Sequence, residues 1–167
     1  ALQAGAHAGE IIGEAANWAR DLVNEPANYL TPRELARRVQ AEAHAAGVSV
    51  QVLGEAEMAE LGAGSFLGIA RGSDEEAQFI VLDYTPANAA DLPTVALVGK
   101  GITFDTGGIS IKPTENMWKM KDDMGGAAAT AAAVLAAARL KLPIHAVGLI
   151  PATENMPGGD AIKPSDV

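Results

Sequence analysis

The sequence has 167 residues, a length that favours a single domain large enough to close a hydrophobic core. It lacks cysteine, which excludes disulfide bonds, thiolate metal ligands and a cysteine nucleophile. The 12 Lys and Arg against 21 Asp and Glu give a formal net charge of −9, which disfavours binding to nucleic acid or an anionic membrane and favours cationic ligands such as metal ions.

Two helices are predicted in the first 46 residues. Apolar residues recur at helical spacing over residues 8–24, with polar residues on the opposite face, and this amphipathic pattern ends near Pro26. Thr31 then precedes a proline and stands three residues before Glu34, which is the pattern of a helix N-terminus. We therefore expect a second helix over residues 32–46.

The next segment predicts a strand, a short helix and a flexible stretch. Gly47 is placed to end the second helix, and valines alternate with other residues over 48–53, as in a strand. Residues 55–61 have the pattern of a short helix. Glycines spaced from Gly62 to Gly72 then predict a flexible stretch.

The remaining apolar segments predict the centre of a sheet. Residues 78–84 and 94–98 are nearly continuous apolar runs joined by a polar loop, and we expect both to be central strands covered on both faces. An alanine-rich helix is predicted over 124–140 and another buried strand over 144–150, with a parallel crossover. The expected fold class is therefore α/β, a three-layer α/β/α arrangement with a mostly parallel or mixed central sheet.

We expect a cytoplasmic location, and three features of the sequence are compatible with it. Its longest apolar stretch, residues 125–138, is shorter than the roughly 18 residues that a membrane-spanning helix needs. Residues 1–10 contain no basic residue ahead of an apolar run, so they do not have the pattern of a signal peptide. The absence of cysteine is compatible with a reducing compartment.

Polar residues gather in the loop that follows the second apolar strand. This loop, residues 99–113, contains Lys100, Asp105 and Lys112 among glycines. Ligand crevices of α/β sheets lie beyond the carboxyl ends of strands, so the loop has the expected position of a site, although Asp105 by itself can be a turn residue or a ligand. Asp123 comes just before the alanine-rich helix, where a carboxylate can either cap the helix or hold a cation.

Two glycine motifs for phosphate binding fail at this loop. A Walker A loop needs glycine five residues before the Gly-Lys pair and Ser or Thr after it, but Thr94 and Gly101 stand there. A dinucleotide-binding motif that starts at Gly99 needs its third glycine at the position of Phe104. A phosphate-binding α/β domain that uses residues 99–108 is therefore only a third hypothesis.

The histidines and two further polar segments receive no catalytic role. His7, His44 and His145 lie outside both polar clusters and are interpreted as structural or solvated. Residues 155–159 (NMPGG) are interpreted either as a turn or as a segment that shapes the substrate side of a site. The acidic residues 74–76 are interpreted as a solvated loop.

Four segments together form a specific pattern. They are NWARDLVNEP at residues 17–26, VGKGITFDTGGISIKP at 98–113, DMGG at 123–126 and ENMPGG at 154–159. This pattern resembles the catalytic domain of the leucyl aminopeptidases, the M17 metallopeptidase family, over nearly the whole chain. The resemblance implies that residues 1–167 are the N-terminal part of that catalytic domain.

The resemblance also implies a two-metal enzyme. Members of the family bind two divalent ions, usually Zn²⁺ or Mn²⁺, and release N-terminal, leucine-like residues from peptides. Carried over to this sequence, Asp105 bridges the metals, and Lys100 and Asp123 bind the more readily exchanged one. A lysine amine ligates only when it is neutral, which adjacent divalent charge enforces by lowering its pKa. Lys112 would stay protonated as the catalytic cation that polarises the scissile carbonyl.

Part of the family pattern lies outside this sequence. The family continues with a motif of the form NTDAEGR, which supplies further Asp and Glu ligands and an Arg that holds a bicarbonate ion as general base. The sequence ends at Val167 without that motif, and it also lacks the family's separate N-terminal domain. We therefore expect a sheet that is incomplete relative to the family's catalytic domain, and weak metal binding and little or no peptidase activity from these 167 residues alone.

Two hypotheses of different class follow. The leading one is a metal-dependent aminopeptidase that acts on peptides with a free N-terminus and is a homo-hexamer when complete. The alternative is a non-catalytic assembly or interaction module of a hexameric aminopeptidase-like protein. DNA binding, which some family members show, is disfavoured by the net charge of −9. Metal-dependent activity separates the two hypotheses.

Overall fold

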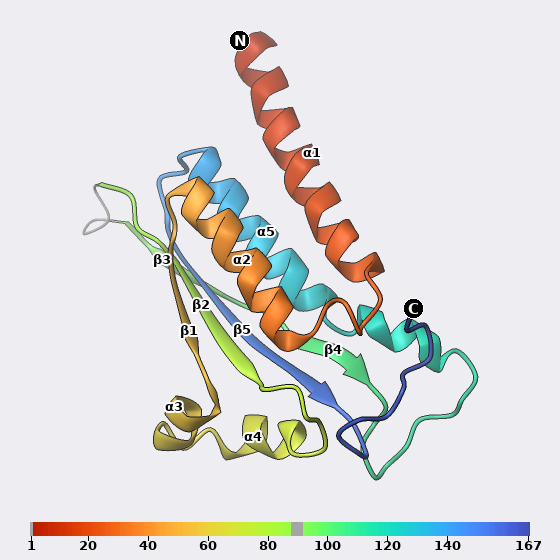
Figure 1. Cartoon of the computed structure of the whole chain (residues 1–167). Helices are drawn as coiled ribbons and strands as arrows, with labels where there is room; N and C mark the ends of the chain where they lie inside the picture. The colour runs from red at the N-terminus through yellow and green to blue at the C-terminus, as the bar shows by residue number, and fades with distance from the viewer. Residues whose placement is uncertain (1, 88–91) are drawn as a thin grey trace.

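The computed structural model describes residues 2–87 and 92–167 (Figure 1). In chain order its helices and strands are α1 (Leu2–Asn24), α2 (Pro32–Ala46), β1 (Ser49–Leu53), α3 (Glu55–Glu60), α4 (Gly64–Ala70), β2 (Gln78–Tyr84), β3 (Thr94–Val98), β4 (Gly101–Asp105), the 3-10 helix η2 (Met117–Asp122), α5 (Gly125–Arg139) and β5 (His145–Asn155). Within these ranges no helix combines the length and the apolarity that crossing a bilayer requires.

The strands form one mixed sheet around β5. β1 pairs antiparallel with β2, and β2 pairs antiparallel with β5, whereas β3 and β4 both run parallel to β5. β3 pairs with the first half of β5 and β4 with its second half, so β3 and β4 lie end to end along one side of β5. The mixed sheet confirms the predicted α/β class, and the parallel pairing of β3 with β5 confirms the predicted crossover through α5.

Helices cover both sides of this sheet, as the three-layer prediction requires (Figure 1). α2 and α5 pack on one face, and α1 packs on α5. α4 lies on the other face, where Phe66 of α4 meets Phe79 of β2 edge to face at 6.0 Å. The main core lies between α2, α5 and the sheet, and its fully buried members include Leu35, Val39, Ile80, Leu82 and Val134.

The ends of α2 follow the predicted capping signals. The Thr31 hydroxyl accepts a hydrogen bond from the Glu34 backbone N–H at 3.3 Å. Gly47 adopts the left-handed conformation with φ 69°, which glycine reaches without the steric cost that a Cβ atom would add. These local signals account for the agreement between the predicted and observed bounds of α2.

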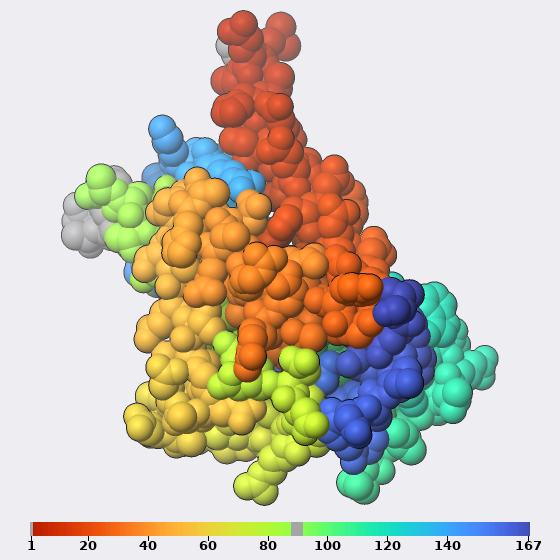
Figure 2. All heavy atoms as spheres, viewed as in Figure 1, coloured from red at the N-terminus to blue at the C-terminus, as the bar shows by residue number. Residues whose placement is uncertain are grey.

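α1 and β5 are longer than predicted. α1 begins at Leu2 rather than near residue 8, and Figure 2 shows its N-terminal part standing clear of the rest of the molecule. Alanine, which has the highest helix propensity, recurs in this first part, and it extends a helix whose later part is packed on α5. β5 continues past Ile150 to Asn155, because its second half pairs with β4.

The prediction that residues 94–98 form a central strand is wrong for the described part of the chain. β3 ends the strand order, whereas β2 is central. Val95 and Val98 are 40% and 71% exposed, so the apolar run is not covered on both faces. An apolar run predicts that a strand is buried, but it does not identify the segment that covers the strand.

Two further segments differ from the prediction. Residues 64–70, expected to be a flexible stretch, form α4, because Phe66 and the buried Ala70 give this segment a face that packs on the sheet. Residues 101–105, expected within a loop, form β4. Between β3 and β4, the hydrogen bonding to β5 continues, because the Gly99 N–H donates to the Leu149 carbonyl at 3.0 Å.

Candidate metal and catalytic site

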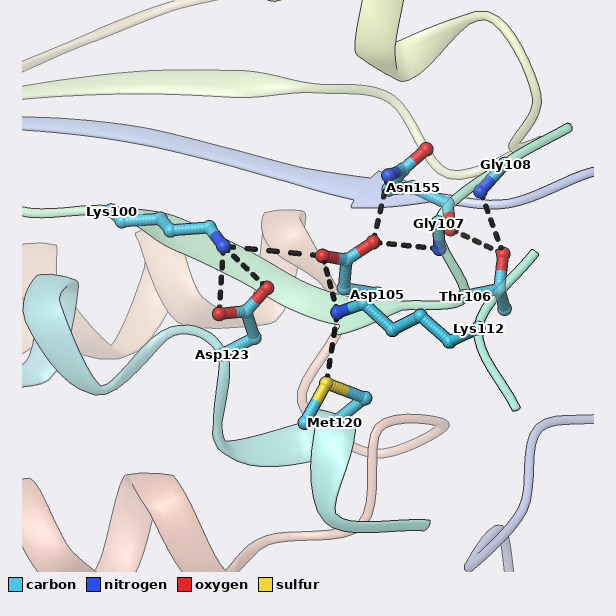
Figure 3. A network of polar contacts seen from close by, with 9 residues as sticks. All are labelled: Lys100, Asp105, Thr106, Gly107, Gly108, Lys112, Met120, Asp123 and Asn155. Carbon is cyan, nitrogen blue, oxygen red and sulfur yellow. Dashed lines mark hydrogen bonds and ion pairs between the residues drawn. The ribbon is translucent and has the colours of Figure 1, made fainter. Parts of the chain in front are cut away.

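The structure brings the four predicted site residues into one cluster (Figure 3). Lys100 lies at the junction of β3 and β4, and Asp105 is the last residue of β4. Lys112 lies in the loop after β4, and Asp123 lies between η2 and α5. The cluster therefore joins segments 23 residues apart in sequence, from Lys100 to Asp123, at the carboxyl end of β4.

Two glycines shape the loop that connects Asp105 to Lys112. Gly107 and Gly108 have φ values of 90° and 65°, which favour glycine. A Cβ atom on Gly107 would lie 2.4 Å from the Ser110 carbonyl oxygen. The Lys112 N–H donates to the Thr106 carbonyl at 2.8 Å, so the loop closes and returns Lys112 to the end of β4.

Asp105 is the most enclosed member of the cluster, with a side chain only 10% exposed. Its Oδ1 accepts hydrogen bonds from the Gly107 N–H at 2.8 Å and from Asn155 Nδ2 at 2.7 Å. Its Oδ2 lies 2.7 Å from Lys112 Nζ and 3.9 Å from Lys100 Nζ. One carboxylate thus contacts both lysines of the cluster.

Asp123 pairs with Lys100 through both carboxylate oxygens, at 2.7 and 2.6 Å. The N-cap position of α5 belongs to Met124, so the interpretation of Asp123 as a helix cap is not supported by this geometry. The side chain instead faces the cluster. Lys100 is 55% exposed, and it is the most accessible of the four.

Burial raises the pKa of both carboxyl groups, but their polar neighbours leave the two pKa values shifted in opposite directions. Burial raises the pKa of Asp105, but hydrogen bonding with Lys112, Asp123, Gly107 and Asn155 outweighs it and holds the pKa at about 2. Burial also raises the pKa of Asp123; Lys100 lowers it, Asp105 raises it further, and the net direction is upward. Both carboxyl groups lie within 4 Å of Lys100 Nζ, at 3.9 Å for Asp105 and 2.6 Å for Asp123, so they already share one cation.

The donor set fits part of a divalent metal site. Carboxylate oxygens are hard ligands, and Lys100, Asp105 and Asp123 are the groups that could hold a metal ion. In this structure, the carboxylates of Asp105 and Asp123 are paired with the side chains of Lys100 and Lys112. Across residues 2–87 and 92–167, no group of three or more His, Cys, Asp or Glu side chains is arranged to hold a metal ion. The fit is therefore partial.

Sequence reasoning did not assign Asn155 and Met120 to the cluster. Asn155 donates to Asp105, and Met120 of η2 places its sulfur 2.9 Å from Lys112 Nζ. Asn155 lies in the NMPGG segment, for which a turn and a substrate-side role were both open. The pairing of Asp105 with Asn155 in the ladder is what decides its place.

The histidines take no part in the contacts of this cluster among the described residues. His7 lies 3.6 Å from Glu10 on α1, and His44 is exposed on α2. His145 contacts Asp83 at 3.1 Å and Thr94 at 3.0 Å, near the start of β5. These positions agree with the structural or solvated interpretation.

An open cavity of about 420 Å³ lies beside the cluster. It is bounded by the end of α4, the loop after β4 and the end of β5, and its lining includes Arg71, Gly108, Ile109, Ser110 and Asn155. Ile109 is 95% exposed, so it stands at the open rim of the cavity.

Comparison with known proteins gives one consistent result. The family model described as "Cytosol aminopeptidase family, catalytic domain" matches residues 17–167. The "Probable cytosol aminopeptidase" of Chlorobaculum tepidum is 50% identical over 167 residues, which are 100% of this chain and 33% of that protein. The "Probable cytosol aminopeptidase" of Roseiflexus castenholzii is 54% identical over 159 residues, which are 95% of this chain and 32% of that protein.

Solved structures that resemble this chain include two enzymes. The bottromycin maturation enzyme BotP in complex with Mn has a TM-score of 0.85 and 45% identity, and the match covers 96% of this chain and 34% of that one. The apo leucyl aminopeptidase from Trypanosoma cruzi has a TM-score of 0.84 and 35% identity, and the match covers 93% of this chain and 30% of that one. The chain spans about one third of the length of the curated relatives it matches.

Proposed function

Because the chain belongs to the cytosol aminopeptidase family, we propose that it carries part of the active site of a metal-dependent aminopeptidase that releases N-terminal, leucine-like residues from peptides. The observation that carries this proposal is the cluster of Lys100, Asp105, Lys112 and Asp123 at the end of β4. The names of the relatives, cytosol and leucyl aminopeptidases, support the reaction class and a cytoplasmic location.

In this proposal, Lys100, Asp105 and Asp123 hold divalent metal ions, and further ligands come from residues outside this chain. The solved structure of BotP is a complex with Mn, which supports Mn²⁺, and Zn²⁺ is the other candidate. Two bound divalent ions would supply a water of lowered pKa and polarisation of the scissile carbonyl. Lys100 would then bind as a neutral amine and would exchange its present pairing with Asp123 for a metal bond.

Lys112 is the proposed catalytic cation. Its Nζ lies 2.7 Å from Asp105 Oδ2, so the side chain is held beside the proposed metal ligands. It donates to the oxygen of the scissile carbonyl as negative charge develops there. Removing one such donor costs about 2.7 to 4 kcal/mol of transition-state stabilisation in a comparable site.

We further propose that residues 1–167 form the N-terminal part of the catalytic domain. In the complete enzyme, a bicarbonate ion would supply the general base, and the protein would be a homo-hexamer. The open cavity beside the cluster then receives part of the peptide substrate, because it reaches the cluster at Gly108 and Asn155.

The test uses the full-length protein, meaning the complete enzyme of which residues 1–167 are proposed to be a part. Its hydrolysis of leucyl p-nitroanilide is measured after removal of metal with EDTA, and again after addition of Mn²⁺ or Zn²⁺. We expect activity to disappear with EDTA and to return with metal, and Asp105→Asn to abolish both activity and Mn²⁺ binding. Metal-independent hydrolysis, or full Mn²⁺ affinity in Asp105→Asn, would contradict the proposal. A protein that binds no metal and hydrolyses nothing would favour the alternative of a non-catalytic assembly module.

A further inference from the structure

Asn155 is the last residue of β5 and stands opposite Asp105, the last residue of β4. Its side-chain amide donates to Asp105 Oδ1 at 2.7 Å. Its carbonyl accepts from the Thr106 N–H at 2.9 Å and from the Thr106 hydroxyl at 2.8 Å. The backbone of Asn155 is therefore held by bonds that do not involve its side chain, and the amide is left to act on Asp105.

The two oxygens of Asp105 have partners of different kinds (Figure 3). Oδ1 accepts from two neutral donors, the Gly107 N–H at 2.8 Å and the Asn155 amide. Oδ2 faces the two cations, Lys112 at 2.7 Å and Lys100 at 3.9 Å. Neutral donors on one oxygen thus leave the other oxygen for positive charge.

We propose that Asn155 is a positioning residue that fixes the Asp105 carboxylate so that Oδ2 alone is presented to the cations of the site. This inference rests on the proposed function, in which Asp105 is a metal ligand. The torsion that turns a carboxylate is broad, so the carboxylate needs partners on one oxygen to stay in one orientation. With the Asn155 amide removed, Gly107 remains as the single donor to Oδ1 among the described residues.

An amide suits this task better than a charged group. A carboxylate at position 155 would repel Asp105 across a contact of 2.7 Å. A lysine there would compete with Lys100 and Lys112 for the same carboxylate. The amide donates a hydrogen bond and leaves the net charge of the cluster unchanged.

The end of β5 keeps other anchors when the Asn155 side chain is changed. Glu154, which is 2% exposed, accepts from the Ser73 hydroxyl at 2.6 Å and pairs with Lys163 at 3.0 Å. Together with the two bonds from Thr106 to the Asn155 carbonyl, these contacts hold the backbone. We therefore expect variants of Asn155 to fold.

The experiment measures Mn²⁺ binding to the full-length, metal-free protein, from the loss of the free Mn²⁺ EPR signal during titration. Asn155→Leu removes the donor at similar size, and Asn155→Asp replaces it with a repelling charge. Residues that orient metal ligands typically contribute 10- to 100-fold to affinity, so we expect a loss of roughly that size in Asn155→Leu and a larger one in Asn155→Asp. Asn17→Asp, on the exposed face of α1, adds the same charge away from the site and should leave the affinity unchanged.

Thermal unfolding of the metal-free proteins separates positioning from folding. Weakened Mn²⁺ binding by Asn155→Leu with an unfolding midpoint within about 2 °C of the parent supports the inference. Unchanged affinity in Asn155→Leu overturns it, and so does a loss of affinity that is matched by a large fall of the midpoint in both variants. Asp105→Asn, measured alongside, identifies the failing claim: full affinity there contradicts the proposed function itself, whereas lost affinity there with full affinity in Asn155→Leu contradicts only the role of Asn155.

Discussion

Lys100 and Lys112 contact the same Asp105 carboxylate but have different surroundings. Lys100 lies against both oxygens of Asp123 and is 55% exposed. Lys112 is 34% exposed, donates to Asp105 at 2.7 Å and contacts the Met120 sulfur at 2.9 Å. This difference suits the separate roles proposed for them, an exchangeable metal ligand and a retained cation.

Substituting Lys112 should separate catalysis from metal binding. In Lys112→Ala we expect kcat for leucyl p-nitroanilide to fall about 10²- to 10³-fold, because one donor to the developing oxyanion is lost. Metal content, measured by mass spectrometry after dialysis, should stay at the parent level. Lys141→Gln, which removes a lysine beyond the end of α5, is the matched control and should keep full turnover. Loss of metal in Lys112→Ala, or unchanged kcat, would refute the assigned role.

At the scale of helices and strands, the segments around the site are packed so closely at two glycines that backbone touches backbone. A Cβ atom on Gly99 would lie 2.3 Å from the Gly126 carbonyl oxygen, so the β3–β4 junction lies directly against the start of α5. A Cβ atom on Gly72 would lie 1.8 Å from the Met156 carbonyl oxygen, so the segment after α4 lies against the residue that follows β5. These contacts place α4 and the NMPGG segment on one side of the site.

Gly72→Ala should therefore destabilise the protein. The methyl group would displace backbone, and overpacking of this kind costs about 1 to 3 kcal/mol of unfolding free energy. Urea unfolding followed by circular dichroism measures the change. Gly68→Ala is the control, because that glycine lies within α4 with open space around it, and alanine should be neutral or stabilising there by up to about 1 kcal/mol. Equal stability of Gly72→Ala and the parent would contradict the close approach.

A charge network joins the end of α1 to α2 and gives a pH dependence of stability. Hydrogen bonding from Arg37 lowers the pKa of Glu34 to about 2; burial opposes this, and Arg38 adds to the lowering. Arg38 also binds Glu25 at 2.7 Å, which links α2 to the turn after α1. Because the folded pKa of Glu34 lies below the ordinary 4.5, this stabilisation is complete above pH 4.5 and is lost as the pH falls toward 2.

Glu34→Gln should reduce stability at pH 7 by about 1 kcal/mol, since these groups are partly exposed and solvent screens the pairs. The variant should also lose less stability than the parent between pH 5 and pH 2. Urea unfolding at several pH values provides the measurement, and Glu14→Gln, on the exposed face of α1, serves as the control. A parent-like loss of stability in acid would show that Glu34 is not the titrating group.

At the scale of the whole molecule, the exposed apolar side chains include members of β3 and of α1. β3 lies at the edge of the sheet, with Val98 71% exposed, and Leu2 and Ile12 on α1 are 92% and 55% exposed. An edge strand with free backbone groups and exposed apolar side chains promotes association.

We therefore predict that a protein of residues 1–167 self-associates as its concentration rises. The weight-average mass from light scattering after size-exclusion chromatography should increase with loading concentration. Val98→Lys should shift the distribution toward monomer, because a charged side chain at an edge strand disfavours pairing. Ile162→Lys, which places the same charge at an exposed position outside the sheet, is the control variant. A concentration-independent monomer would contradict the prediction.

Local signals were sufficient for much of the fold. The Thr31 cap and Gly47 stop defined α2, and the apolar run of β2 and the alanine-rich pattern of α5 identified these elements, because each signal depends on neighbours in sequence. The sequence patterns do not predict α4 and β4, because these elements depend on distant segments. α4 packs on Phe79, and β4 pairs with β5. The same reason explains the wrong placement of β3, since an apolar run is compatible with an edge or a centre.

For the site, the sequence by itself determined the candidates: Lys100, Asp105, Lys112 and Asp123 are expected from the family resemblance of residues 98–113 and 123–126, and the structure brings them together. Only the tertiary structure decided how they face one another, with Lys100 on Asp123, Lys112 on Asp105 Oδ2, and Asn155 on Oδ1. The residue types determine what chemistry is available. Which oxygen meets which cation depends on the pairing of β4 with β5 and on the loop closed by Gly107 and Gly108, and such contacts between distant segments exist only in the folded chain.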